Sequence, residues 1–198
     1  MLARSLSQMA LWLMVLGGTV VGQTADWTAA PVARPRSGLA RLLPGERDTA
    51  IRLLRPQLGP LFQGESSATA DRAILSFSAE RIRLGSMAAL VVQPNGGELC
   101  SPTGNCSLWI IDLARNRIIL DHGAVQGFGV VKASGQGIPK IVTRMHGSAF
   151  DSEQILWRFN GSRYEAKKCV DIQFDENATN APPATKPYPC SAEGNRQE

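Results

Sequence analysis

The residues QILWRFNGSRYEAKK at positions 154–168 decide the fold of this chain. Two runs of strand-forming residues flank Asn160-Gly161, a pair typical of the two-residue type I′ turn of a β-hairpin. Such a turn sets the side chains that face each other, namely Ile155 and Ala166, Trp157 and Tyr164, and Arg158 and Arg163. The aromatic pair favours a packed face, and the opposed arginines require water on the other face. The stretch therefore predicts an antiparallel hairpin with one buried and one solvated side.

Upstream of this hairpin, short apolar runs alternate with turn-forming residues. The predicted strands are Met87–Gln93, Leu108–Leu113, Ile118–Asp121, Phe128–Ala133 and Lys140–His146. Before them, hydrophobic side chains recur at period two from Ile74 to Leu84, with a change of phase that a β-bulge near Glu80-Arg81 would explain. Strands joined by short turns predict an antiparallel meander, sandwich or half-closed barrel.

One stretch, Leu39–Phe62, has helical rather than strand periodicity. Pro44-Gly45 can begin a helix, and Glu46 suits its first turn because a carboxylate there faces the positive end of the helix dipole. We expect Pro56 to end or kink this helix after Arg55. The predicted fold class is therefore mainly β (α+β), with one N-terminal helix packed on an antiparallel sheet.

Residues 1–25 have the layout of a secretory signal peptide, with Arg4, an apolar run over Met9–Val21 and small residues over Gly22–Ala25. The apolar run, about 13 residues, is shorter than the ~20 residues that span a bilayer. We expect cleavage, no stable membrane insertion afterwards, and an extracytoplasmic location, either periplasmic or secreted. The remaining chain divides into a flexible lead-in over 26–38, a single β-rich domain over 39–174 and a disordered tail over 175–198.

The charge of the chain argues against a nucleic-acid partner. The formal net charge is +4, and the basic residues are scattered along the sequence. A nucleic-acid-binding domain concentrates lysine and arginine on one surface. We expect a mildly basic surface with no nucleic-acid partner, and no motif in the sequence predicts a cofactor.

The four cysteines, Cys100, Cys106, Cys169 and Cys190, can form disulfides in an oxidising compartment. Turn-forming residues between Cys100 and Cys106 let the two ends of that loop approach closely, so we favour a Cys100–Cys106 disulfide. A Cys169–Cys190 disulfide would then hold the tail against the last strand. Four cysteines allow three connectivities, and the sequence alone does not select one. The spacings fit neither a zinc site nor a Cys-x-x-Cys redox pair.

Several segments resemble, in the same order, those of a group of small exported bacterial proteins of unknown function. They are the strands Leu90–Gln93 and Leu108–Ile111, the Leu99–Cys106 loop between them, Gln126–Phe128, His146–Ala149, and the hairpin Trp157–Tyr164 followed by Cys169. The loop is similar to a Cys-x-x-Thr-Gly-Asn-Cys loop in that group, and the hairpin to its Trp/Tyr-Arg-Phe-Asp/Asn-Gly-x-x-Tyr motif. The resemblance covers about Ile74–Cys169. It implies an exported bacterial protein and no particular activity.

The closing hairpin is also similar to the calcium-binding repeats of β-propellers, which carry an Asp-rich loop ahead of a hydrophobic strand. The matching stretch, Ile82–Ser86, contains no acidic residue. Calcium needs several oxygen ligands, usually with carboxylates among them, so we expect no calcium at this loop. A sandwich or half-closed barrel is favoured over a propeller, because about eight strands would form only two four-stranded blades.

Only two histidines occur, His122 and His146, each at the end of a predicted strand. With Ser148 as nucleophile, His122 as base and Asp151 as its partner, the chain offers the residue types of a hydrolase. The Gly-x-Ser-x-Gly and His-Glu-x-x-His motifs are absent, and two distant histidines are a weak indication of a metal site. We predict no metal site and favour a non-enzymatic role. A small secreted hydrolase or metal-dependent enzyme using His122 and His146 is the alternative.

The function predicted from the sequence is that of a binding or inhibitor module of the bacterial envelope. Disulfide-tied loops on a rigid β scaffold are suited to contacting another molecule. The candidate contact segments are Ser101–Asn105, Asp121–Gly123 and His146–Asp151, and the individual candidates are Thr103, Asn105 and His146. The expected partner is an envelope or extracellular protein.

Overall fold

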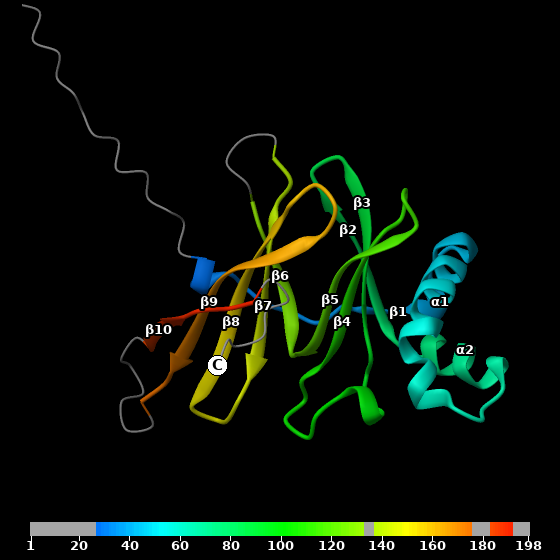
Figure 1. Cartoon of the computed structure of the whole chain (residues 1–198), viewed down its shortest axis with the longest axis horizontal. Helices are drawn as coiled ribbons and strands as arrows, with labels where there is room; N and C mark the ends of the chain where they lie inside the picture. Colours follow the sequence, from blue (N-terminus) through cyan, green and yellow to red (C-terminus); the bar gives the residue numbers. More distant parts are fainter. Residues whose placement is uncertain (1–26, 133–136, 176–182, 192–198) are drawn as a thin grey trace, which may run out of the picture.

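A pair of helices and two β-sheets form three layers (Figure 1). A computed structural model of the chain describes residues 27–132, 137–175 and 183–191. The predicted signal peptide, residues 1–25, lies outside the described residues. The helices cover one face of the first sheet, and the second sheet packs against its other face. The predicted fold class, an antiparallel mainly-β fold with N-terminal helical structure on the sheet, is confirmed.

Both sheets are antiparallel, and neighbouring strands follow one another along the chain. Sheet 1 contains, in spatial order, β1 (Ser37–Gly38), β2 (Ser78–Leu84), β3 (Met87–Gln93), β4 (Cys106–Asp112) and β5 (Arg117–Val125). Sheet 2 contains β10 (Ala184–Tyr188), β9 (Tyr164–Gln173), β8 (Asp151–Phe159), β7 (Lys140–His146) and β6 (Gly127–Val131). The sheets join where β5 runs into β6 through Gln126, whose amide donates to the carbonyl of Arg144 at 2.8 Å.

Two hydrophobic cores hold the layers together. Between the sheets lie Leu108 and Ile110 of sheet 1 and Trp157 of sheet 2, all buried. Between sheet 1 and the helices lie Leu54 and Leu90, also buried. Strands β3 and β4 contribute side chains to both cores, so their sequences are continuous apolar runs instead of alternating ones.

The helical layer contains α1 (Pro44–Leu58) and α2 (Ser67–Leu75). Short 3-10 turns complete the helical elements: η1 (Trp27–Ala29), η2 (Leu39–Arg41), η3 (Gly59–Phe62) and η4 (Gly97–Leu99). The expected end of the helix after Arg55 is wrong, because α1 continues through Pro56 to Leu58. Pro56 lies on the exposed side of the last turn of the helix, so its ring does not disturb the packed side.

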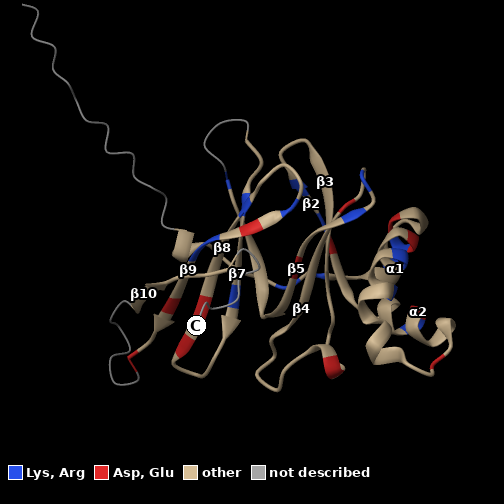
Figure 2. Cartoon of the chain, in the orientation of Figure 1, with Lys and Arg blue, Asp and Glu red and all other residues tan. Residues whose placement is uncertain are grey.

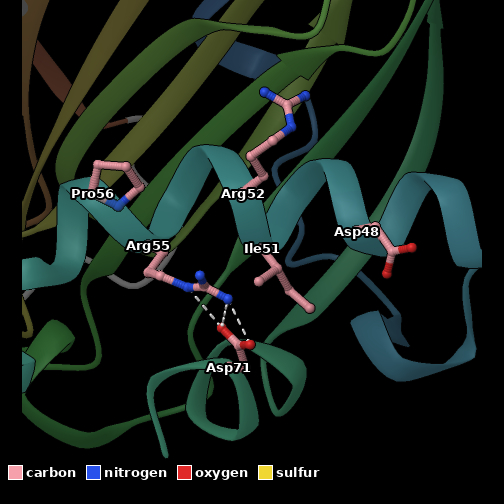
Figure 3. A pocket seen from close by; sticks show the side chains of 6 residues that line it. All are labelled: Asp48, Ile51, Arg52, Arg55, Pro56 and Asp71. Atoms are coloured by element: carbon pink, nitrogen blue, oxygen red, sulfur yellow. Dashed lines mark hydrogen bonds and ion pairs between the residues drawn. The ribbon is translucent and has the colours of Figure 1, made fainter. Parts of the chain in front are cut away.

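The sequence did not predict α2, and Ile74 and Leu75, which were expected to start a strand, form its last turn. Ser66 begins this helix as an N-cap, with its hydroxyl accepting from the amide of Thr69 at 3.2 Å. Arg55 of α1 donates to both carboxylate oxygens of Asp71 in α2 at 2.5–2.9 Å, whereas Arg52 points away from that pair (Figure 3). The ion pair joins the two helices on their exposed side.

The bulge expected near Glu80-Arg81 does not occur, because β2 pairs with β3 in unbroken register. The change of phase has another cause. Ala79 packs toward the helices, while Ile82 and Leu84 pack between the sheets. A strand that buries residues on both faces gives a pattern that resembles a shift in register.

The 154–168 hairpin forms, but its predicted register is wrong. The residues that face each other are Ile155 and Cys169, Trp157 and Ala166, Arg158 and Glu165, and Phe159 and Tyr164. The loop therefore holds four residues, 160–163, and the side-chain oxygen of Asn160 accepts from the amides of Ser162 and Arg163 at 2.8 and 2.9 Å. Gly161 has a φ of 103°, which favours glycine. The longer loop separates the aromatic and arginine pairs that a two-residue turn would have formed.

Residues 30–38, expected to be part of a flexible lead-in, are paired with both sheets, and we call them the N-terminal strap. Ala33 exchanges two backbone hydrogen bonds of 3.0 Å with Phe128 of β6, and β1 pairs with β2. A Cβ atom on Gly129 would overlap the carbonyl of Pro31, so this close approach requires glycine. The strap, blue in Figure 1, therefore connects the two sheets.

Part of the tail that was expected to be disordered forms β10, with Tyr188 opposite Cys169 of β9. The strand contains Lys186 and Pro187 and is mostly exposed, so it carries little of the apolar pattern that identifies a strand. Residues 176–182 and 192–198 of the predicted tail lie outside the described part of the chain.

Both favoured disulfides, Cys100–Cys106 and Cys169–Cys190, are present. They indicate an oxidising, extracytoplasmic environment. Within residues 27–132, 137–175 and 183–191, no helix has the length and apolar character needed to cross a membrane.

Candidate functional site

The disulfide loop of sheet 1 and the loop after β7 of sheet 2 meet at one end of the molecule, which we call the loop end (residues 101–105 and 146–151). The contact is made by Asn105, which is 5% exposed. Its side-chain oxygen accepts from the amide of His146 at 2.9 Å, and its side-chain nitrogen donates to the carbonyl of His146 at 2.7 Å. One buried amide therefore satisfies a whole peptide group of the other sheet and fixes the two loops to each other.

Arg34 of the N-terminal strap holds the disulfide loop from another side. Its guanidinium donates to the carbonyl of Gln126 at 3.1 Å and to the carbonyl of Gly104, and lies 3.8 Å from the sulfur of Cys106. Within the loop, the hydroxyls of Ser101 and Thr103 lie 2.7 Å apart. The disulfide loop is therefore tied to the strap, to the β5–β6 corner and to the His146 segment.

The loop between β7 and β8 closes on itself. The amides of Gly147 and Ser148 both donate to the carbonyl of Asp151, at 3.2 and 3.3 Å. The hydroxyl of Ser148 donates to the Asp151 carboxylate at 2.9 Å and accepts from the amide of Phe150 at 3.1 Å. A Cβ atom on Gly147 would collide with the same carboxylate, so glycine is required there. These contacts describe a self-capped turn.

Beside this turn lies an open cavity of about 330 Å³, lined among others by Met145, His146, Asp151, Glu153 and Asp171. Figure 2 shows these acidic residues gathered at the loop-end halves of β8 and β9. The Glu153 carboxylate accepts from the Tyr188 hydroxyl at 3.1 Å. The cavity is therefore negative in character, and Glu153 links it to β10.

His122 lies inside the molecule instead of at the loop end. Its ring packs edge-on against Trp157, with the ring centroids 5.0 Å apart, and only 6% of the residue is exposed. Burial lowers the pKa of His122 to about 4, and the nearby Glu153 carboxylate opposes this shift more weakly. Its Nε2 atom has no hydrogen-bond partner among the described residues. His122 is a neutral core residue at neutral pH.

The structure brings together some of the predicted site residues and separates others. Asn105, His146, Ser148 and Asp151 share the loop end, with Thr103 hydrogen-bonded to Asn105 at 3.1 Å. Asp121–Gly123, the third predicted contact segment, lies within β5. Throughout the described part of the chain, no hydrogen bond joins Ser148 to either histidine.

Two exposed aromatic residues at the same end were not singled out from the sequence. Phe150 and Phe174 are each 47% exposed, and the amide of Phe174 donates to the carbonyl of Phe150 at 2.7 Å. The sequence signal was an aromatic residue within a polar turn, which is weak because single exposed apolar residues are common. Their proximity depends on the pairing of β8 with β9.

The chemistry that this end can perform follows from those contacts. A serine that donates to a carboxylate, with no imidazole to accept its proton, lacks the base of a Ser-His-Asp triad. Within the described ranges, no three His, Cys, Asp or Glu side chains are placed to hold a metal ion. The arrangement fits recognition of another molecule better than bond cleavage.

Comparisons with protein-family models, with curated proteins and with solved structures find no match to this chain. Function must therefore be argued from the site itself.

Proposed function

We propose that this chain is a non-enzymatic binding module of the bacterial envelope, periplasmic or secreted, that contacts a protein partner through the loop end. The observation that carries the proposal is the Asn105–His146 contact, in which one buried side chain fixes the disulfide loop to the turn after β7. Loops that are held rigidly before binding lose less conformational entropy when a partner docks.

The exposed aromatic residues support a protein partner. Phe150 and Phe174 lie beside the acidic cavity, so the loop end combines aromatic surface with polar groups. Aromatic residues are enriched in protein interfaces, where they bury large areas at a small cost in side-chain entropy. Polar groups around them would orient the partner.

The alternative, a small hydrolase or metal-dependent enzyme, receives less support. Catalysis would need His122 or His146 to accept a proton from Ser148, whereas His122 packs on Trp157 and the Ser148 hydroxyl donates to Asp151. An ester or peptide substrate screen that gave turnover in the native chain, abolished by Ser148→Ala, would favour the enzyme over the binding module.

Retention of partners by the immobilised, oxidised, exported protein tests the proposal. An envelope extract is passed over the native chain, over Phe150→Ser, and over Leu43→Ser, which removes a residue that is 61% exposed next to α1. We expect a specific protein to be retained by the native chain and by Leu43→Ser but lost with Phe150→Ser. A variant lacking the Cys100–Cys106 disulfide should also lose it. Equal retention by all variants, or no retained protein, would contradict the proposal.

A further inference from the structure

We propose that a groove between the helical layer and the η4 turn binds a short basic, amphipathic peptide segment. This site is distinct from the loop end, and the inference goes beyond the proposed function. The groove encloses about 370 Å³ and lies between η3, α2 and the turn before Cys100. Its volume falls at the lower end of the range for ligand cavities, which suits one or two side chains better than a large cofactor.

The floor and walls of the groove are apolar. They are formed by Leu61, Phe62, Ala73, Phe77 and Leu99. Phe77 is 5% exposed and stacks on Trp109 with the ring planes 7° apart, so the floor is firmly supported. Leu61 is 42% exposed, which leaves an apolar wall uncovered. An apolar side chain placed here would be removed from water on several sides.

Two carboxylates, Glu65 and Glu98, line the same groove from different segments of the chain. Both are exposed, and within the described residues neither forms a hydrogen bond or an ion pair through its side chain. Other carboxylates on the helical layer, those of Glu46 and Asp71, are paired with arginines. The groove therefore offers negative charge without an internal counter-ion, and charge complementarity selects a cationic occupant.

The rim of the groove favours a peptide over a small amine. Gly96 and Gly97 line it, both are exposed, and a Cβ atom at either position would meet no other atom within 4 Å. Open glycine backbone lets a second main chain approach closely enough to exchange hydrogen bonds. Lysine or arginine stems could lie along the apolar walls with their charged ends at the two carboxylates. An apolar residue flanked by basic residues matches each of these features.

Binding of two blocked pentapeptides to the full exported chain tests this site. Isothermal titration calorimetry compares acetyl-Lys-Leu-Phe-Leu-Lys-amide with acetyl-Glu-Leu-Phe-Leu-Glu-amide. We expect the basic peptide to bind, the acidic peptide not to bind, and the affinity to fall about tenfold as sodium chloride rises from about 50 to about 500 mM. Equal affinity for the two peptides, or no binding of the basic one, would overturn the proposal.

Variants then locate the site. Glu65→Gln with Glu98→Gln should weaken binding of the basic peptide about tenfold, and Ala73→Phe should abolish it by filling the groove. The matched control, Asp48→Asn with Glu165→Gln, removes two carboxylates that pair with neighbouring basic residues elsewhere, and should bind like the native chain. Thermal unfolding of each variant establishes that it is folded.

A second copy of the chain is the rival occupant. If sedimentation shows a dimer that Ala73→Phe dissociates, the groove is a self-association surface and the peptide proposal fails. Unchanged peptide affinity in the Glu65→Gln, Glu98→Gln variant would likewise refute it.

Discussion

At the scale of single residues, His122 makes the stability of the fold depend on pH. The folded protein keeps the ring neutral, with a pKa of about 4, whereas the unfolded chain has the ordinary value of about 6.5. Between these two pH values the unfolded chain binds a proton that the folded chain does not. Stability from this residue is therefore complete above about pH 6.5 and falls on acidification by up to about 3 kcal/mol near pH 4.

Urea unfolding of the native chain and of His122→Leu at pH 7, 6, 5 and 4 measures this effect. Carboxylates contribute equally to the acid sensitivity of both proteins, so the difference between the two curves isolates the imidazole. We expect the free energy of unfolding to fall more steeply for the native chain. Parallel curves for the two proteins would show that His122 titrates normally.

Asn105 is the residue whose loss should most disturb the loop end. Asn105→Ala leaves the amide and the carbonyl of His146 without their partners in a part-buried place, at a cost of about 2–3 kcal/mol. Thr103→Ala, a control at an exposed loop position, should cost less than about 1 kcal/mol.

Two readouts test the Asn105 prediction, chemical unfolding and hydrogen exchange at the amide of His146. In Asn105→Ala that amide should exchange faster than in the native chain, while amides of β3 keep their protection. Asn105→Asp retains an acceptor for the amide but cannot donate to the carbonyl, so it should lie between the two. Unchanged exchange at His146 would mean that the loops are held together by other contacts.

At the scale of elements, Pro56 gives an opportunity to stabilise α1. The helix continues for two residues beyond Pro56, although proline removes one helical hydrogen bond and crowds the preceding turn. Because Pro56 is exposed, Pro56→Ala restores the bond without changing the packed side, and we expect about 1 kcal/mol of added stability. A matched substitution at the exposed Gln57, Gln57→Ala, should change stability by less than about 0.5 kcal/mol. Thermal unfolding distinguishes these results, and a loss of stability in Pro56→Ala would show that proline benefits the fold through the unfolded chain.

The elements also show how far local sequence determines structure here. Strands β3, β4 and β7 could be predicted because each has a continuous apolar run ended by turn residues. The hairpin loop could not, since Asn160-Gly161 suits both a two-residue turn and the four-residue loop that Asn160 caps. Helix α2 and strand β10 were missed because their apolar content is low and their partners are distant in sequence.

At the scale of the whole molecule, the candidate site depends on contacts that no local pattern encodes. The residue types at 101–105 and 146–151 could be identified as loop residues, and the Cys100–Cys106 disulfide could be favoured from its spacing. That Asn105 bonds the peptide of His146, and that His122 turns inward onto Trp157, follows from how two sheets pack. Long-range pairing also explains the strap, in which Ala33 reaches β6 across about ninety intervening residues.

The two disulfides allow a comparison of what each contributes to the whole fold. Cys169–Cys190 closes a separation of 21 residues and Cys100–Cys106 one of 6. Because a longer closed loop removes more freedom from the unfolded chain, the first should stabilise by about 3 kcal/mol and the second by about 2 kcal/mol. Each pair has one buried and one half-buried cysteine, so replacing both members with serine carries similar burial costs.

Urea unfolding of Cys169→Ser with Cys190→Ser, and of Cys100→Ser with Cys106→Ser, should therefore rank the first variant as less stable by about 1 kcal/mol. The effects on binding should rank the other way, because the short disulfide positions Asn105 at the loop end, whereas the long one holds β10. Partner retention in the envelope assay measures the second ranking. If the Cys169–Cys190 variant lost both more stability and more retention, β10 and the acidic cavity beside it would be the contact surface in place of the disulfide loop.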